Sequence, residues 1–344
     1  MTPVQPAPTA ARRILLTALL AIAVLVLAGC ASTTNGAGKP ASPLASSASS
    51  SASSSASTSS SSAAPTAPVH ISLLESDGAT YGVGMPIVAY FTQNITDSAA
   101  FIKATTVTVN GAPAGGAWYF EANGDTTKPM AAHYRPQNYW PADSTIKMDM
   151  PVQGLSAGKG LSFDDSLTLS ISIGDAHIST VDCAAERMTV TSNGAPAFPA
   201  PFPTSCGAAT TPTNSGTKVV MQLGEDTPGT DTLRPNGAVR MVGGGGALGN
   251  YDLLVNWSVR ITAGGEYVHS APWNGNNIGA RSTSDGCTNL SPTNAEAFYK
   301  FSHIGDIVTS VNTGGPALNI GDGFGDWNLP WSTWLAGGAV LTDN

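Results

Sequence analysis

Short runs of alternating or β-branched residues, separated by turn residues, constrain the fold of this 344-residue chain more than any other feature. The runs are four to seven residues long, and Gly, Asn and Pro punctuate the sequence between them. Strands of this length with frequent turns are typical of a small β-sandwich. The sequence therefore predicts a sandwich over residues 69–174. Its expected strands are 70–73, 86–90, 105–109, 145–150 and 167–173.

The chain from residue 175 to 344 is also rich in predicted strands. The run 187–191 is followed by Asn193-Gly194, the dipeptide most typical of a two-residue hairpin turn. One helix is expected after Cys287, where Ser291-Pro292 supplies a cap and a first-turn proline. The fold class is therefore mainly β, with one or two short helices in this second part.

The N-terminus has the pattern of an export signal. Arg12 and Arg13 precede an uncharged apolar run over 14–28, which is shorter than the ~20 residues that a membrane span needs. The run ends in Leu27-Ala28-Gly29-Cys30, which resembles the bacterial lipobox, whose cysteine takes a diacylglycerol. The alternative is an ordinary signal peptide in which Cys30 is incidental. Residues 1–29 are predicted to be a lipoprotein signal peptide, with Cys30 as the lipidation site.

A tract of Ser, Ala, Thr, Pro and Gly follows the signal. It contains no aromatic residue and almost no charge, so it cannot bury enough surface to offset the entropy of ordering a chain. Residues 30–68 are therefore predicted to be a disordered tether, with an r.m.s. reach of ~35 Å. The domain prediction is a signal at 1–29, the tether at 30–68, a sandwich at 69–174 and a second domain with a C-terminal tail at 175–344.

Charge excludes one class of partner. The formal net charge is −8, and loss of Arg12 and Arg13 with the signal would take it to about −10. Nucleic-acid affinity depends on Lys and Arg neutralising phosphates, so no nucleic-acid partner is expected. No Cys-x-x-Cys motif and no paired histidines occur, so no metal site and no cofactor are predicted.

The segments carrying His269 and Cys287 are the most informative for chemistry. A cysteine needs a nearby base to become a good nucleophile, because the thiolate is the reactive form. His269 precedes Cys287 by 18 residues, and a strand, a loop and a glycine-preceded turn could bring them together. For an arbitrary pair at this spacing, one buried histidine and one buried cysteine would be the commoner explanation.

The surrounding residues resemble the L,D-transpeptidase (YkuD-type) catalytic domain in its actinobacterial form. The resemblance rests on His-Ser-Ala-Pro-Trp at 269–273 and Ser-x-Gly-Cys-x-Asn at 284–289. It extends to the Thr-Pro loop at 211–216, to 251–257, and to the C-terminal signatures 305–308 and 325–331. Residues 69–174 resemble the immunoglobulin-like (Ig-like) domain that precedes the catalytic domain in mycobacterial members.

The resemblance implies a role for each matched residue. Cys287 would be the nucleophile, His269 its base and later the acid, and Ser270 would orient the imidazole through its backbone carbonyl. The oxyanion and substrate would be bound by further residues of the site. These are the N–H groups of Gly286 and Cys287, the Tyr251 hydroxyl, Trp273, which would line the cleft, and Asn289, which would brace the loop.

Asp285 departs from the family, which has histidine at this position. A carboxylate two residues from the nucleophile would raise the pKa of the thiol if it points inward. Two outcomes are open. Asp285 could face the acceptor side and hold an incoming ammonium group, or activity could be weakened or lost. Retained activity is favoured here because the other matched residues are present.

The remaining cysteines, Cys183 and Cys206, lie in the exported part of the chain. A disulfide between them is the favoured interpretation, and two free thiols are the alternative. The glycine run 243–246 precedes Tyr251 and is interpreted as a mobile lid. The tryptophans 327, 331 and 334 are interpreted as a tail packed onto the domain rather than as a carbohydrate platform. Four histidines are expected to be structural or exposed: His70, His133, His177 and His303.

By resemblance, the chain would form 3→3 cross-links between peptidoglycan stem peptides through a thioester. Its donor and acceptor would both be tetrapeptide stems, and carbapenems would acylate Cys287. A lipid anchor would hold the protein on the cell membrane, facing the wall. The alternatives are an L,D-carboxypeptidase or hydrolase of the same fold, in which water resolves the thioester, and a non-catalytic lipoprotein that binds the wall.

Overall fold

The computed structural model describes residues 66–246 and 248–338. The predicted signal peptide, Cys30 and most of the predicted tether lie outside these residues. Strand β1 begins at Ala67, two residues before the predicted start of folded sequence. Among the described helices, none has the length and apolar character needed to cross a membrane.

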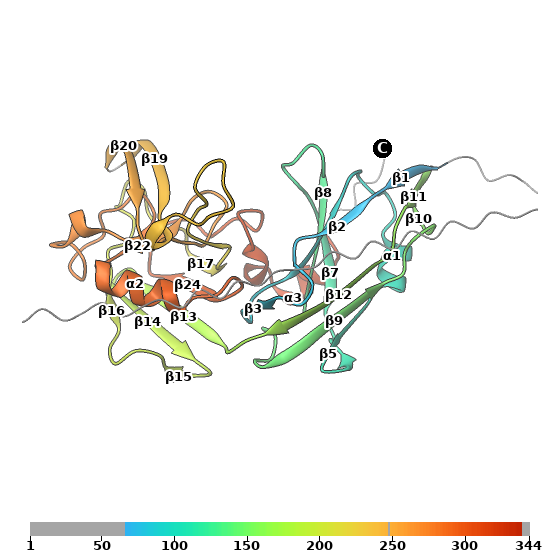
Figure 1. Cartoon of the computed structure of the whole chain (residues 1–344), viewed down its shortest axis with the longest axis horizontal. Helices are drawn as coiled ribbons and strands as arrows, with labels where there is room; N and C mark the ends of the chain where they lie inside the picture. The colour runs from blue at the N-terminus through green and yellow to red at the C-terminus, as the bar shows by residue number, and fades with distance from the viewer. Residues whose placement is uncertain (1–65, 247, 339–344) are drawn as a thin grey trace, which may run out of the picture. The chain divides into compact units, whose positions relative to one another are not determined.

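The first part of the described chain forms three sheets (Figure 1). One has the order β1 (Ala67–Val69), β11 (Leu161–Phe163), β10 (Ser156–Gly158). The second has the order β3 (Thr80–Tyr81), β12 (Leu167–Ile173), β9 (Ser144–Met150), β5 (Thr106–Val109), β6 (Ala112–Pro113). The third has the order β2 (Ile71–Leu73), β4 (Ile87–Phe91), β8 (Met130–Arg135), β7 (Ala117–Ala122).

Alternation along the strands and a cluster of aromatic rings explain why this part folds as a sandwich. Burial alternates strictly along β9, so one face of the strand enters the core. The only helix of this part, α1 (Ala99–Ala104), places Phe101 in that core. The Phe101 ring lies 5.4 Å from the ring of Phe91 and 5.0 Å from that of Trp118, in edge-to-face geometry.

The second part of the described chain is also mainly strands, as predicted. A sheet has the order β15 (Ala195–Pro196), β14 (Arg187–Ser192), β13 (His177–Asp182), β24 (Ile307–Val311), β17 (Gly216–Val219), with β16 (Phe202–Pro203) also pairing with β14. A four-stranded sheet has the order β18 (Gln222–Leu223), β21 (Val259–Arg260), β22 (Tyr267–Ser270), β23 (Thr288–Leu290). Strands β19 (Val239–Gly246) and β20 (Gly249–Val255) form a hairpin.

Two local predictions for this part are confirmed. Asn193 and Gly194, both with positive φ, form the two-residue turn between β14 and β15. Helix α2 (Pro292–Phe301) follows the cysteine, and the Ser291 hydroxyl accepts a hydrogen bond from the Asn294 N–H at its N-terminus. The other helical turns are η1 (Pro235–Gly237), η2 (Pro272–Asn274), η3 (Gly325–Asn328) and α3 (Trp331–Trp334).

The C-terminal tail contacts both parts of the chain. Asn328 of η3 exchanges hydrogen bonds with Thr217 of β17 in the second part, and the following residues pack onto β7 and β8 of the first part. The Trp334 indole N–H donates to the carbonyl of Ala117 at 2.9 Å. The guanidinium of Arg135 lies 4.7 Å from the ring of Trp327 and 4.3 Å from that of Trp334. These contacts support the interpretation of the tryptophans as a packed tail, because their rings are occupied by protein groups.

Candidate active site

Parallel pairing of β22 with β23 brings the two segments of the predicted site together. In the register of this pair, His269 lies opposite Asn289, and Cys287 comes immediately before β23. One pocket is lined by six of the predicted site residues: Tyr251, His269, Trp273, Asp285, Cys287 and Asn289. The pocket is completed mainly by apolar side chains of the β19–β20 hairpin.

Hydrogen bonds from two directions fix the turn that carries Cys287. Gly286 has a φ of +109°, a backbone conformation that favours glycine. The hydroxyl of Ser284 donates to the carbonyl of Cys287 at 2.6 Å, and the hydroxyl of Thr213 donates to the carbonyl of Gly286 at 2.8 Å. The peptide groups before and after Cys287 are therefore held in one orientation.

His269 has the environment of a neutral imidazole. Its side chain is buried, its Nδ1 lies 3.0 Å from the carbonyl oxygen of Ser270, and its ring stacks with Trp273. A carbonyl only accepts, so Nδ1 carries the proton and Nε2 is left as a base. Burial lowers the pKa of His269 to about 4, against the weaker opposing effect of the Ser270 hydrogen bond.

The thiol of Cys287 is also neutral at rest. Burial raises its pKa to about 12, and the negative charges of Glu266 and Asp285 act in the same direction. The thiol donates to the carbonyl of Gly265 at 3.8 Å. The resting pair is therefore a thiol and an imidazole rather than a thiolate and an imidazolium.

Asp285 faces the β19–β20 hairpin. Its Oδ1 accepts from the hydroxyl of Thr211 and from the backbone N–H of Leu248, both at 3.2 Å. A side chain on Gly246 would collide with the Asp285 carboxylate, so glycine permits the close approach. Asp285 lines the pocket that contains Cys287 and also a second, polar groove beside Glu266.

The glycine run 243–246 belongs to a strand in the structure. It forms the end of β19, which pairs only with β20 among the described residues. A side chain on Gly243 would collide with the ring of Tyr251, which lies opposite it in the hairpin. Burial raises the pKa of Tyr251, and the nearby Cys287 adds to the effect, so the phenol remains a hydrogen-bond donor.

Asn289 braces the site through its backbone. Its N–H donates to the Ser205 carbonyl at 2.9 Å, and the Ser205 N–H donates back to Asn289 at 3.1 Å. Its side chain is buried and lines the pocket, and its Oδ1 has no hydrogen-bond partner among the described residues.

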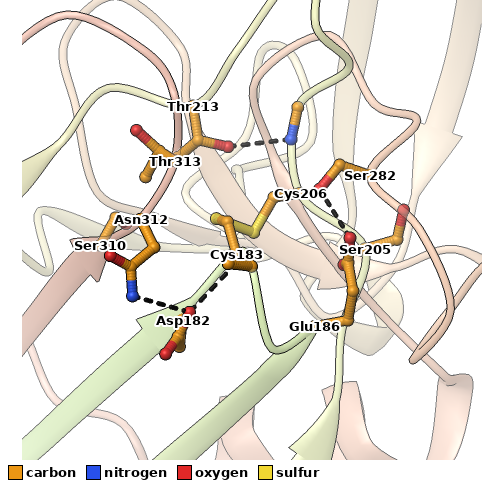
Figure 2. The surroundings of a disulfide bond; sticks show 12 residues. Asp182, Cys183, Glu186, Ser205, Cys206, Thr213, Ser282, Ser310, Asn312 and Thr313 are labelled. Atoms are coloured by element: carbon orange, nitrogen blue, oxygen red, sulfur yellow. Dashed lines mark hydrogen bonds between the residues drawn. A yellow bond between two sulfur atoms is a disulfide. The ribbon is translucent and has the colours of Figure 1, made fainter.

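Cys183 and Cys206 form a disulfide in the structure, with their Cα atoms 5.7 Å apart (Figure 2). This bond ties the end of β13 to the segment behind the turn that carries Cys287. The carbonyl of Cys206 accepts from the N–H groups of Thr283 and Ser284 at 2.9 and 3.0 Å. The disulfide therefore supports the turn that precedes Cys287.

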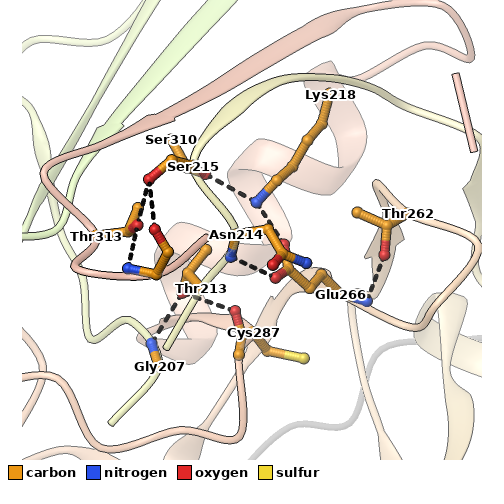
Figure 3. A network of polar contacts seen from close by, with 12 residues as sticks. Gly207, Thr213, Asn214, Ser215, Lys218, Thr262, Glu266, Cys287, Ser310 and Thr313 are labelled. Carbon is orange, nitrogen blue, oxygen red and sulfur yellow. Dashed lines mark hydrogen bonds and ion pairs between the residues drawn. The ribbon is translucent and has the colours of Figure 1, made fainter. Parts of the chain in front are cut away.

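Sequence reasoning missed a polar network on the other side of Cys287 (Figure 3). Lys218 is fully buried and forms an ion pair with Glu266, which accepts from the backbone N–H of Asn214. The available signal was a single lysine before the apolar residues 219–221 and a single glutamate before β22. Lysine and glutamate are almost never fully buried unless they are paired, so each of these isolated charges implied a partner elsewhere in the chain.

The histidines outside the site have protein partners. His133 Nδ1 lies 2.9 Å from Asp326 Oδ1, and His70 Nδ1 lies 3.2 Å from Asp164 Oδ1. In the described chain one group could hold a metal ion, because ligand atoms of His177, His303 and Asp306 lie within 4.8 Å of one another. None of these three residues lines the pocket that contains Cys287.

Comparison with known proteins agrees with this geometry. Residues 42–156 match the bacterial Ig domain and residues 176–309 match the L,D-transpeptidase catalytic domain. The chain is 34% identical over 283 residues to L,D-transpeptidase 2 and 28% identical over 280 residues to L,D-transpeptidase 5, both of Mycobacterium tuberculosis. These alignments cover 80% of this chain but 64% and 58% of the two relatives.

Two solved structures are similar over most of the folded chain. The LD transpeptidase LdtMt1 in complex with imipenem aligns with a TM-score of 0.55 and 27% identity, over 72% of this chain and 99% of its own. An L,D-transpeptidase from Mycobacterium smegmatis aligns with a TM-score of 0.53 and 26% identity, over 71% of this chain and 99% of its own.

Proposed function

Because residues 176–309 match the L,D-transpeptidase catalytic domain and follow a match to the bacterial Ig domain, we propose that this chain is a peptidoglycan L,D-transpeptidase. It joins two tetrapeptide stems through a thioester and makes 3→3 cross-links. The observation that carries the proposal is that Cys287 and a neutral, oriented His269 line the same pocket. The Ser270 carbonyl holds the imidazole as a general base requires.

In the first half-reaction, Cys287 Sγ attacks the carbonyl carbon between diaminopimelate and the terminal D-Ala of the donor. Nε2 of His269 takes the thiol proton as the S–C bond forms. The same proton passes to the D-Ala nitrogen as the C–N bond breaks, and D-Ala leaves. Because the pKa of the thiol is high and that of the imidazole is low, proton transfer accompanies attack rather than preceding it.

The oxyanion of each tetrahedral intermediate would be bound by the N–H groups of Gly286 and Cys287 and by the Tyr251 hydroxyl. In the second half-reaction, the side-chain amine of another stem attacks the thioester. It gives a proton to His269, which returns the proton to sulfur as the C–S bond breaks. Trp273 and Asn289 would line the path of the peptide.

The test is incubation of the protein with tetrapeptide stems, and separately with a carbapenem, followed by intact mass measurement. A stem dimer and a carbapenem adduct on Cys287 are expected. Tripeptide without dimer would favour the hydrolase, in which water attacks the same thioester. Neither product would favour a protein that only binds the wall.

The substrate requires a location outside the cytoplasm, and the lipobox-like segment adds a membrane anchor to the proposal. We expect the mature protein to partition into detergent, and Cys30→Ala to release it or leave an uncleaved precursor. A wild-type protein that is wholly water-soluble, with an unmodified N-terminus, would contradict the anchor.

In this proposal, Asp285 affects both the rate of acylation and the ratio of cross-linking to hydrolysis. Asp285→Asn keeps an oxygen for Thr211 and Leu248 but removes a charge that raises the pKa of Cys287. Carbapenem acylation is therefore expected to accelerate by about threefold to tenfold. Cross-linking relative to hydrolysis should fall, because the carboxylate no longer attracts the cationic acceptor. Asp285→His is expected to act in the same direction.

The control is Asp252→Asn, which removes an exposed carboxylate from β20, in the hairpin that Asp285 faces. It should change neither rate. Unchanged or slower acylation by Asp285→Asn would mean that Asp285 does not act on the thiol. An unchanged ratio of cross-linking to hydrolysis would mean that it does not hold the acceptor.

A further inference from the structure

A buried ion pair lies directly behind the turn that carries Cys287 (Figure 3). Lys218, on β17, has no exposed surface. Its ammonium group donates to Glu266 Oε2 and to the hydroxyl of Ser310, the latter at 3.1 Å. The ion pair thus connects β17 and β24 to Glu266. Glu266 immediately precedes β22 and lies three positions before His269.

Hydrogen bonds through residues 213–214 connect Glu266 to the turn that carries Cys287. Its Oε1 accepts from the backbone N–H of Asn214 at 2.7 Å. The adjacent Thr213 accepts from the Gly207 N–H at 2.9 Å and donates to the Gly286 carbonyl at 2.8 Å. The chain of contacts therefore runs from Lys218 to the peptide group next to the thiol.

Glu266 also approaches the turn directly. A Cβ on Gly286 would lie 3.7 Å from Glu266 Oε1, which is ordinary contact distance. A carboxylate this close to the nucleophile opposes formation of the thiolate unless a cation offsets it. Beyond the effect of burial, the charge of Glu266 raises the pKa of Cys287 and that of Lys218 lowers it.

Stability alone is a poor explanation for the pair. Desolvating two charges can cost as much as their attraction returns, so a buried ion pair is weak support for a folding role. Two apolar side chains could fill the same space without placing a carboxylate beside the nucleophile.

We propose that Lys218 and Glu266 are positioning residues of the active site. Glu266 holds the 213–214 segment against Gly286, and Lys218 both fixes Glu266 and offsets its charge at Cys287. The proposal rests on the proposed function only in taking Cys287 as the nucleophile. It assigns the pair no contact with substrate.

Charged and titratable groups from several elements act on Cys287, and the experiment must hold the others constant. They are Glu266 immediately before β22, Tyr267 and His269 of β22, Lys218 of β17, Asp285 of the turn that carries Cys287, and Tyr251 of β20.

Alkylation of Cys287 by iodoacetamide tests the proposal without any wall substrate. The rate is measured between pH 6 and 10 on the full-length protein, with the modified peptide quantified by mass spectrometry. Glu266→Gln keeps an oxygen for Asn214 and leaves the Lys218 charge without an opposing one. Alkylation at pH 8 should then be about threefold to tenfold faster than in the wild type, with the profile shifted to lower pH.

Lys218→Met should act in the opposite direction, slowing alkylation by a similar factor and shifting the profile to higher pH. The double variant Lys218→Met/Glu266→Gln should return close to the wild-type profile, because it removes both charges. The exposed pair Lys300–Glu296 on α2 supplies a matched control. Lys300→Met/Glu296→Gln should leave the profile unchanged.

The outcomes separate a charge effect from a structural one. If both single variants slow alkylation, the pair is structural only and the proposal is wrong. If neither changes the profile, the pair does not act on Cys287. Should Lys218→Met fail to fold, Glu266→Gln alone decides, since slower or unchanged alkylation contradicts the proposal. Absence of stem dimers in the wild type would overturn the proposed function but not this result.

Discussion

Cys287→Ala is expected to abolish both carbapenem acylation and stem cross-linking, with a loss of at least about 10⁴-fold. Both half-reactions pass through a thioester on this sulfur, and no other free cysteine occurs among the described residues. Alanine removes only the sulfur, so the Gly286 turn and the Thr213 hydrogen bond should persist. The measurement is intact mass after carbapenem treatment, with stem dimers quantified in parallel.

His303→Ala supplies the control, because His303 is exposed and does not line the pocket. It should keep close to wild-type acylation. Cross-links formed by the Cys287→Ala protein would show that the thioester mechanism is wrong.

The sequence predicted those parts of the fold that depend on residues close together in the chain. Asn193-Gly194 specified a hairpin because both positions need positive φ, and Ser291-Pro292 specified a helix start through a cap and a fixed φ. Spacing alone favoured one buried histidine and one buried cysteine, so the pairing of His269 with Cys287 came from the family resemblance. In the structure β23 runs parallel to β22, and both residues line one pocket.

Features that depend on contacts between residues far apart in the chain could not be predicted from the sequence. Lys218 and Glu266 are 48 residues apart, and nothing near either residue identifies its partner. The surface on which the C-terminal tail packs was also unpredictable, because Trp334 and Ala117 are 217 residues apart. The orientation of Asp285 depends on the folded position of Leu248, which local patterns do not determine.

His269→Gln is expected to lower acylation at pH 7 by about 10²–10⁴-fold. Glutamine can still donate a hydrogen bond, but it cannot take the thiol proton during attack. Burial keeps the pKa of wild-type His269 at about 4, so its imidazole is neutral throughout the range from pH 6 to 9. The wild-type acylation rate should therefore be nearly constant over that range.

The variant should respond to pH in a different way, because it depends on thiolate formed by solvent. With the pKa of Cys287 raised to about 12, the thiolate fraction is small and grows about tenfold per pH unit between pH 6 and 9. The acylation rate of His269→Gln should grow by the same factor, so the deficit relative to wild type narrows as pH rises. Stopped-flow measurement of carbapenem acylation at several pH values gives both profiles. A variant as pH-independent as the wild type would show that His269 is not the base, whatever the size of the rate loss.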